Sequence, residues 1–292
     1  MQTKTAFIAL FGRPNVGKST LLNALLGCKV SIVSPKPQTT RQKVTGILSE
    51  GDTQLVFADT PGVHHAKNKL GSFMDEVVGE SAAGADVAVL VVASGDEVRE
   101  NEKRMLSMLK GHRAVLVINK IDLHPKEEIL KTIAAFSKAY DFDEIVPVSA
   151  YKKDGVTLLK DLLKGFAVPA PFFYDEQSVT DMSEPEMICE AAREKMLYLL
   201  GDEIPHGVAV HLEYLEKSQS TVRVGLSIIC ERDSHKGIII GKNGRMISKI
   251  NAAVRKELEF MYDTKVFLES FVKVKPNWRN DAAMLKDFGF TK

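Results

Sequence analysis

The stretch that most constrains this chain is GRPNVGKST, residues 12–20, which follows the apolar run AFIALF. It matches the pattern G-x-x-x-x-G-K-[S/T]. In such a loop glycines let backbone amides surround phosphate oxygens, the lysine neutralises the phosphates, and the following hydroxyl can bind Mg²⁺. The sequence therefore predicts a nucleotide-phosphate site between a strand and a helix, with these roles for Lys18 and Ser19.

Short apolar runs separated by helix-length segments occupy the first 165 residues. They read AFIALF, LVFAD, DVAVLVVA, AVLVIN and IVPVSA. Runs of this kind are typical of strands buried on both faces, so we expect an α/β domain with a mostly parallel sheet and helices on both faces. Two runs flank Glu50-Gly51-Asp52, which predicts a hairpin and one antiparallel edge strand.

The stretch DTPG, residues 59–62, ends the second of these runs. Asp59 could hold Mg²⁺ through water, and the amide of Gly62 could contact a γ-phosphate. Small signalling GTPases place a glutamine after this glycine to orient the attacking water, but here the residue is Val63. Because valine can neither donate nor accept a hydrogen bond, we expect nucleotide binding without this catalytic element and slow intrinsic hydrolysis.

Two further strand ends carry groups suited to a purine base. NKID, residues 119–122, presents Asp122, which can accept both the N1 and N2 protons of guanine, whereas adenine has no such donor pair. The aliphatic part of Lys120 can lie against the nucleotide, and SAY at residues 149–151 can offer the Ala150 amide to the guanine carbonyl. The order of these motifs predicts a guanine-nucleotide site.

The stretch AVPAPFFYDEQSVTDMSEPEM, residues 167–187, is broken by prolines and acidic residues and predicts an interdomain linker. Beyond it we expect a small α+β domain in the order α-β-β-α-β. In its last helix Ile247, Ile250, Val254, Leu258 and Met261 form a stripe expected to face the core. The predicted boundaries are 1–166 for the nucleotide domain, 167–184 for the linker, 185–280 for the second domain and 281–292 for a C-terminal tail.

A second motif, IIIGKNGRMI at residues 238–247, contains a GxxG that we place between a strand and a helix. In KH domains, such a loop lets backbone approach a single RNA strand and clamp its phosphates. The flanking Lys242 and Arg245 fit this role, and the order resembles a type II KH domain. A KH-like fold that no longer binds RNA remains an alternative.

Charge and cysteine content limit the kinds of partner and the cellular compartment that this chain can have. The formal net charge is +1, but residues 205–292 hold 15 Lys and Arg against 10 Asp and Glu, and the rest 24 against 28. The basic C-terminal part suits a polyanionic partner or a solvated surface. The three cysteines lack metal-ligand spacing, and no apolar run approaches the roughly 20 residues that cross a bilayer, so we expect an intracellular soluble protein.

Together these motifs resemble the Era family of TRAFAC-class GTPases over nearly the whole chain. The resemblance implies that PQTTRQ, residues 37–42, is switch I, where Thr39 or Thr40 closes on Mg²⁺; we favour Thr40. It also implies that Asn15 ligates K⁺, as in cation-dependent relatives, where K⁺ takes roughly the place of an arginine finger; the alternative is that Asn15 only shapes the loop. It implies GTP and GDP as ligands, and as partners the small ribosomal subunit and its RNA near the 3′ end. A cytoplasmic monomer with peripheral contact at the inner face of the cell membrane is also expected.

Two other classes stay open. One is an ATP-driven enzyme or kinase, which the NKID stretch disfavours; the other is a membrane or cell-cycle signalling GTPase whose KH domain binds protein. We expect His64 and His65 to be solvent-facing loop residues, and Trp278 to pack on the second domain rather than touch RNA or membrane.

The predicted site residues fall into three sets. The nucleotide-binding set is Gly12, Arg13, Pro14, Asn15, Val16, Gly17, Lys18, Ser19, Thr20, Asp59, Thr60, Pro61, Gly62, Val63, Asn119, Lys120, Ile121, Asp122, Ser149, Ala150 and Tyr151. Catalytic roles are predicted for Lys18, Asn15 and Thr40, and metal ligation for Ser19, Thr40 and Asp59. The RNA-binding set is Ile240, Gly241, Lys242, Asn243, Gly244, Arg245 and Lys249.

Overall fold

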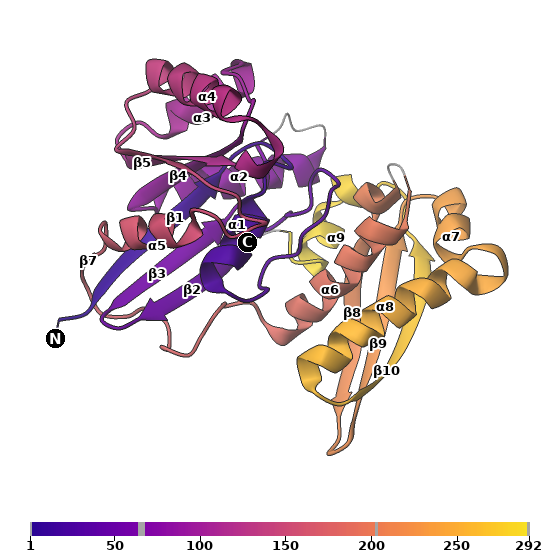
Figure 1. Ribbon diagram of the computed structural model, residues 1–292. Helices are drawn as coiled ribbons and strands as arrows, with labels where there is room; N and C mark the ends of the chain where they lie inside the picture. Colours follow the sequence, from indigo (N-terminus) through magenta and orange to yellow (C-terminus); the bar gives the residue numbers. More distant parts are fainter. Residues whose placement is uncertain (1, 64–67, 202–203, 291–292) are drawn as a thin grey trace. The chain divides into compact units, whose positions relative to one another are not determined.

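The computed structural model describes residues 2–63, 68–201 and 204–290, which form two compact units (Figure 1). Most of the first 181 residues make up the first unit, and the second unit begins its main segment at Met182. The boundary between them falls inside the predicted linker. His64 and His65 lie outside the described residues.

The first unit is an α/β domain built on one sheet in the order β2-β3-β1-β4-β5-β6, with β7 paired to β1. All pairs along this order are parallel except β2 with β3, so the hairpin and its antiparallel edge strand are confirmed. Its elements are β1 (Lys4–Phe11), α1 (Lys18–Leu26), β2 (Val44–Glu50), β3 (Thr53–Asp59), α2 (Lys69–Ala83), β4 (Val87–Ala93), α3 (Glu100–Met108), β5 (Arg113–Asn119), α4 (Lys126–Ala139), β6 (Glu144–Pro147), α5 (Val156–Lys164) and β7 (Val168–Pro169).

Near-continuous apolar strands bury this sheet on both faces, as the sequence predicts. Leu90 and Leu116 are fully buried, and they share a core cluster with side chains from α2, α3 and α4. On the other face, a Cβ at Gly46 would come within 2.8 Å of the side chains of Leu22 and Leu26 in α1, so the glycine lets that helix approach β2 closely. The parallel arrangement brings the carboxyl ends of β1, β3, β4 and β5 to one edge.

The first part of the predicted linker is held against the first unit. Thr5 of β1 pairs with Val168, and the Oε1 atom of Gln54 accepts hydrogen bonds from the amides of Phe173 and Tyr174 at 2.8 and 3.1 Å. Further along, the amide of Ile47 donates to the carbonyl of Val179 at 2.9 Å. The segment therefore follows the sheet through specific contacts as far as Thr180, whose hydroxyl donates to the carbonyl of Thr45 at 2.7 Å.

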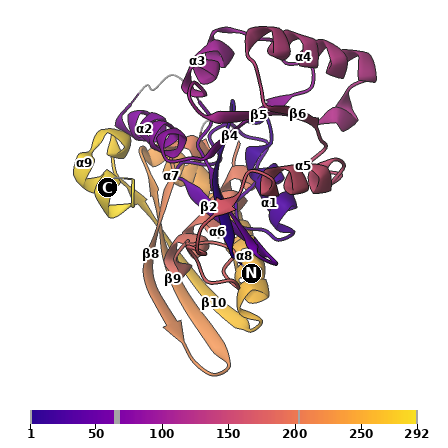
Figure 2. The ribbon, with the colours of Figure 1, turned by 90° about the vertical axis from the view of Figure 1, so that its left-hand side faces the viewer.

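The second unit is an α+β domain whose strands run in the order β10-β9-β8, visible side by side in Figure 2. Strand β9 is antiparallel to β8 and parallel to β10. The core contains Ile250, Val254 and Leu258 of α8, as predicted. The elements are α6 (Glu184–Leu199), β8 (Ala209–Lys217), β9 (Thr221–Cys230), α7 (Asp233–Ile240), α8 (Arg245–Tyr262), β10 (Lys265–Val274) and α9 (Ala282–Asp287), with short 3-10 turns at Ile204–Gly207, Lys242–Gly244 and Trp278–Asn280; a further 3-10 turn, Ile121–Leu123, belongs to the first unit.

Two predictions about this unit were wrong. The GxxG does not follow a strand, because residues 233–240 form helix α7, and the order is α-β-β-α-α-β. The run of isoleucines at 238–240 favours a strand by local propensity, but only Ile239 is buried there, as expected for a helix with one face on the core. Met261 is 38% exposed, and Tyr262 packs against the core instead.

The C-terminal segment packs on the second unit, as expected for Trp278. The indole is fully buried and donates to the carbonyl of Gly207 at 3.0 Å. Its ring stacks on Phe290 and meets Phe288 edge-on, with centroid separations of 6.1 and 5.7 Å. Among the described residues, no helix is long and apolar enough to cross a membrane.

Candidate functional site

The glycine loop between β1 and α1 has the geometry of a phosphate cradle. Gly12 and Gly17 have φ angles of 151° and 99°, which favour glycine, and a Cβ at Gly12 would lie 2.3 Å from the carbonyl of Val91. Lys18 is buried, and its ammonium donates to the carbonyls of Gly12 and Arg13 at 2.9 and 3.0 Å. Burial lowers the pKa of Lys18 to about 8, although the nearby Asp59 carboxylate opposes this shift. A cation held in this way at the loop is poised to meet an anion.

Three hydroxyl groups surround one oxygen of Asp59 at the end of β3. The Oδ2 atom accepts from Ser19 at 2.6 Å, Ser31 at 2.8 Å and Thr40 at 3.4 Å, and the hydroxyls of Ser19 and Thr40 lie 3.0 Å apart. The second oxygen, Oδ1, is buried and has no hydrogen-bond partner among the described residues. Burial raises the pKa of this carboxyl, while Lys18 and the hydroxyls lower it.

This donor set fits Mg²⁺, which takes oxygen ligands. The orphaned oxygen of Asp59 is an acceptor that a cation or its bound water would satisfy, since leaving it unpaired is costly. Of the two switch I threonines, Thr40 is buried beside Ser19 and Asp59, whereas Thr39 is half-buried. The geometry supports the predicted ligand set Ser19, Thr40 and Asp59.

The residue after DTPG has its side chain in the core. Val63 is 3% exposed and packs in the same cluster as Phe11 and Val78, and its amide donates to the carbonyl of Gly12 at 3.2 Å. A Cβ at Gly62 would lie 2.6 Å from the nitrogen of Pro14, so the DTPG turn approaches the phosphate loop more closely than any other residue would allow. Val63 therefore anchors this turn, and its side chain contributes no polar group to the site.

Asn119 joins the phosphate loop to the two base-reading strand ends. Its carboxamide nitrogen donates to the carbonyl of Val16 at 2.9 Å, and its oxygen accepts from the amides of Lys120 and Ala150 at 2.8 and 3.0 Å. Lys120 has a φ of 62°, and its ammonium donates to the carbonyl of Asn15 at 2.6 Å. The elements β1, β5 and β6 are thereby fixed relative to one another at this edge.

Asp122 is oriented by its neighbour at the end of β6. The buried hydroxyl of Ser149 donates to Oδ1 of Asp122 at 2.6 Å, and this hydrogen bond holds the pKa of the carboxyl below its usual value. The carboxylate stays ionised at neutral pH and can accept from two N–H groups. Tyr151 is 84% exposed, so its ring lies in solvent rather than in the site's packed wall.

The GxxG loop joins α7 to α8 in the second unit. Gly241, Asn243 and Gly244 have positive φ angles of 72°, 54° and 74°. A Cβ at Gly241 would lie 2.7 Å from that of Met246, whereas a Cβ at Gly244 would meet nothing within 4 Å. Gly244 therefore leaves open space at the first turn of α8, where unpaired backbone amides favour an anion.

The side chains around this loop are basic and accessible. Lys242 and Arg245 are exposed, and Lys249 lies one turn further along the exposed face of α8. Ile240 is half-buried at the end of α7. The predicted RNA-binding residues are thus brought together, although the loop connects two helices.

Comparisons with known proteins agree with both halves of this arrangement. A family model described as a 50S ribosome-binding GTPase matches residues 7–120, and a KH-domain model matches residues 203–279. The GTPase Era of Clostridium kluyveri is 43% identical over 290 residues, which cover 98% of this chain and 99% of that protein. The chain belongs to the Era family of GTPases. The GTPase Era of Geotalea uraniireducens is 44% identical over 292 residues, covering 99% of this chain and 98% of its own length.

Solved structures of Era superpose on the whole chain. One is a complex of Era with MgGDPNP and nucleotides 1506–1542 of 16S ribosomal RNA; it is 34% identical, with a TM-score of 0.95, and the match covers 99% of this chain and 100% of that one. A variant of Era from Aquifex aeolicus bound to GDP and AlF₄⁻ gives the same values. The predicted fold, a P-loop GTPase domain followed by a KH domain, is confirmed.

Sequence reasoning missed two features of this Era-family site. Ser31 is 1% exposed and donates to Asp59, yet it lies in the stretch KVSIVSP, which carries no motif. Arg13 pairs with Asp96 and with Glu102, the latter at 2.6 Å, and so ties the phosphate loop to the segment before α3 and to α3 itself. A buried acid such as Glu102, opposite a loop arginine, could be found only once the sheet order is known.

Proposed function

We propose that this chain is a GTP-hydrolysing switch that binds small-subunit ribosomal RNA and assists assembly of the small ribosomal subunit. The observation that carries the nucleotide half is the position of Asn119, hydrogen-bonded to Val16 of the phosphate loop and Ala150 of the base-reading turn. One ligand that spans phosphate and base would fill such a site. The oriented carboxylate of Asp122 favours guanine over adenine.

Ser19, Thr40 and Asp59 would hold Mg²⁺, which supplies positive charge to the β- and γ-phosphate oxygens when bound. Lys18 would bind the same oxygens, and the backbone amides of the loop between Asn15 and Ser19 would orient them. Gly62 lies so close to Pro14 that a Cβ would not fit, and we assign its amide to the γ-phosphate. These groups hold the phosphates in place for attack by water.

Orientation of that water falls to a group other than Val63, whose side chain lies in the core. Asn15 is exposed at the phosphate loop with a φ of 65°. We assign it a role in binding K⁺, where a monovalent cation offsets charge between the β and γ phosphates. Without K⁺, GTP hydrolysis should therefore be slow.

The RNA half of the proposal rests on the GxxG loop. The open space at Gly244, the first turn of α8 and the exposed Lys242, Arg245 and Lys249 together suit phosphates of a single strand. The RNA segment in the matched Era complex supports ribosomal RNA near its 3′ end as the target. The small subunit itself, a cytoplasmic location, a monomeric state and peripheral contact with the inner face of the cell membrane are parts of the proposal that rest on resemblance.

Phosphate release from GTP and from ATP, measured on the full chain with Mg²⁺, tests the enzymatic part. We expect release from GTP alone, strongly reduced in Thr40→Ala and near the parent rate in the matched variant Thr39→Ala. Equal turnover of ATP would contradict the base assignment, and loss in Thr39→Ala instead would move the metal ligand to the other threonine.

A further inference from the structure

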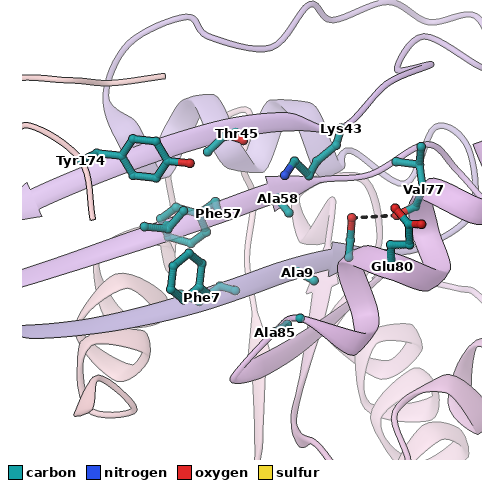
Figure 3. Close-up of a pocket in the computed structure, with 14 residues that line it drawn as sticks. Phe7, Ala9, Lys43, Thr45, Phe57, Ala58, Val77, Glu80, Ala85 and Tyr174 are labelled. Carbon is teal, nitrogen blue, oxygen red and sulfur yellow. Dashed lines mark hydrogen bonds between the residues drawn. The ribbon is translucent and has the colours of Figure 1, made fainter. Parts of the chain in front are cut away.

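A cavity of about 260 Å³ lies on the α2-facing side of the first unit's sheet (Figure 3). It exists because a row of small residues crosses the sheet at this level: Ala9 of β1 is paired with Ala58 of β3, which is paired with Thr45 of β2. Ser81 near the end of α2 and Gly84 just beyond it line the opposite side. No large side chain fills the space between them.

One end of the cavity is aromatic and fixed in position. Phe7 and Tyr174 line it, and the ring of Phe7 meets Phe173 edge-on with centroids 4.8 Å apart. The Oε1 atom of Gln54 accepts from the amides of both Phe173 and Tyr174. This wall is therefore held by hydrogen bonds to the sheet, and a flat apolar group could pack against it at little ordering cost.

The floor contains a buried polar group without a partner. Thr45 is 3% exposed, and its Oγ1 atom has no hydrogen-bond partner among the residues that the structure describes. Buried hydroxyl groups are nearly always satisfied, because an unpaired one keeps its full desolvation cost. By contrast, the hydroxyl of Ser81, on the other side of the cavity, donates to the carbonyl of Val77 at 2.7 Å.

The mouth carries an available positive charge. Lys43 lines the cavity and is exposed, as is Glu80 of α2, and both side chains are labelled in Figure 3. Within the described ranges Lys43 has no ion pair or hydrogen bond. An anionic ligand group could be bound here without displacing an existing partner.

We propose that this cavity binds a small aromatic carboxylate. The ring would lie on Ala9 and Ala58 against Phe7, the carboxylate would pair with Lys43, and the Thr45 hydroxyl would gain its missing partner. The volume is below the roughly 300 to 1,000 Å³ of drug-sized pockets, so the ligand has one or two fused rings. None of the phosphate-loop or base-reading residues lines the cavity, which makes it distinct from the nucleotide site.

The proposal is tested by titrating the full chain, with saturating GDP present, with 1-naphthoate. Binding is measured by ligand-observed and protein-observed NMR. We expect 1-naphthoate to bind saturably. The affinity for the uncharged 1-naphthamide should be at least fivefold weaker. Lys43→Gln should weaken naphthoate binding by a similar factor. The matched variant Lys131→Gln, which removes an exposed charge on α4, should leave the affinity and the basal GTPase rate unchanged.

Filling the cavity gives an independent check. Ala58→Leu, or Ser81→Leu if the first variant does not fold, should abolish binding while GDP affinity is retained. No saturable binding to the parent chain at millimolar probe, equal affinity for the acid and the amide, or unchanged binding in both Lys43→Gln and a folded filling variant would each overturn the proposal.

Discussion

The side-chain amide of Asn119 donates to the backbone carbonyl of Val16 at 2.9 Å, which fastens the end of β5 to the phosphate loop. A Cβ at the neighbouring Gly17 would lie 2.3 Å from the same amide nitrogen, so the contact leaves no room for another residue there. Phosphate recognition and base recognition are therefore built on one rigid edge of the sheet. A substitution in the phosphate loop can therefore affect base recognition, and a substitution at the base-reading strand ends can affect phosphate binding.

Base choice should follow Asp122. Replacing it in Asp122→Asn puts an amide donor where guanine presents N1 and N2 protons, so GTP affinity should fall by about 2 to 5 kcal/mol. Xanthosine nucleotides, which present an acceptor at that edge, should gain affinity. Equilibrium titration with labelled nucleotides measures both.

Ser149→Ala is the matched control, because it removes the hydrogen bond to the carboxylate and keeps the carboxylate itself. It should weaken GTP binding modestly without any gain for xanthosine nucleotides. Unchanged GTP binding in Asp122→Asn would refute the assignment.

Nucleotide affinity should depend on pH through Lys18. Burial lowers its pKa to about 8 in the free protein, and bound phosphates favour the charged form, so binding raises that pKa and takes up a proton above about pH 8. GTP affinity should be nearly constant just below pH 8 and fall above it, by up to about tenfold per pH unit. Calorimetry at pH 8.5 in buffers of different ionisation enthalpy measures the uptake.

Guanosine carries the same base without phosphates and is the control for titration of guanine. Binding of guanosine should take up fewer protons than binding of GTP at the same pH. Equal uptake by the two ligands would show that Lys18 is already fully charged in the free protein.

RNA binding should be sensitive to charge at Gly244 and tolerant of size. Nothing lies within 4 Å of a Cβ there, and asparagine tolerates its φ of 74° better than most residues. Gly244→Asp should therefore lose single-stranded RNA affinity by repelling phosphate, while the nearly isosteric Gly244→Asn retains most of it. Fluorescence anisotropy with labelled RNA compares the two, and GTPase activity without RNA should be near normal in both. If Asp and Asn variants bind equally well, the loop does not contact phosphate.

Hydrolysis should be faster in K⁺ than in Na⁺. Val63 supplies no polar group, and Asn15 is the exposed loop residue to which we assign the cation. Asn15→Ala should abolish the difference between the two salts with GTP affinity little changed. Turnover in matched KCl and NaCl buffers decides it: equal rates in the parent would leave water orientation to switch backbone or to a group from the ribosomal partner.

The sequence predicted those parts of the molecule that local chemistry determines. The phosphate loop, DTPG, NKID and SAY each occupy a strand end, and a parallel sheet brings such ends to one edge. The role of Ser31 and the pairing of Arg13 with Glu102 could not be predicted, because they depend on contacts between distant segments. Helix α7 was missed because the isoleucines at 238–240 favour a strand locally, whereas packing of Ile239 in the core selects a helix.

The burial of Val63 illustrates the same limit. Its chemistry showed that it could not orient water, but only the structure shows that its side chain packs with Phe11 and Val78. The linker shows the same limit. Its prolines and acids indicated a loop, but only the structure shows that Gln54 and Ile47 hold it along the sheet.

Crosslinking of the full chain to RNA in cells, with sequencing of the bound fragments, shows whether the GxxG loop binds ribosomal RNA. We expect crosslinks concentrated near the 3′ end of small-subunit ribosomal RNA, largely lost in Gly244→Asp and retained in Gly244→Asn. Crosslinks spread over unrelated RNAs, or an unchanged pattern in Gly244→Asp, would contradict this expectation.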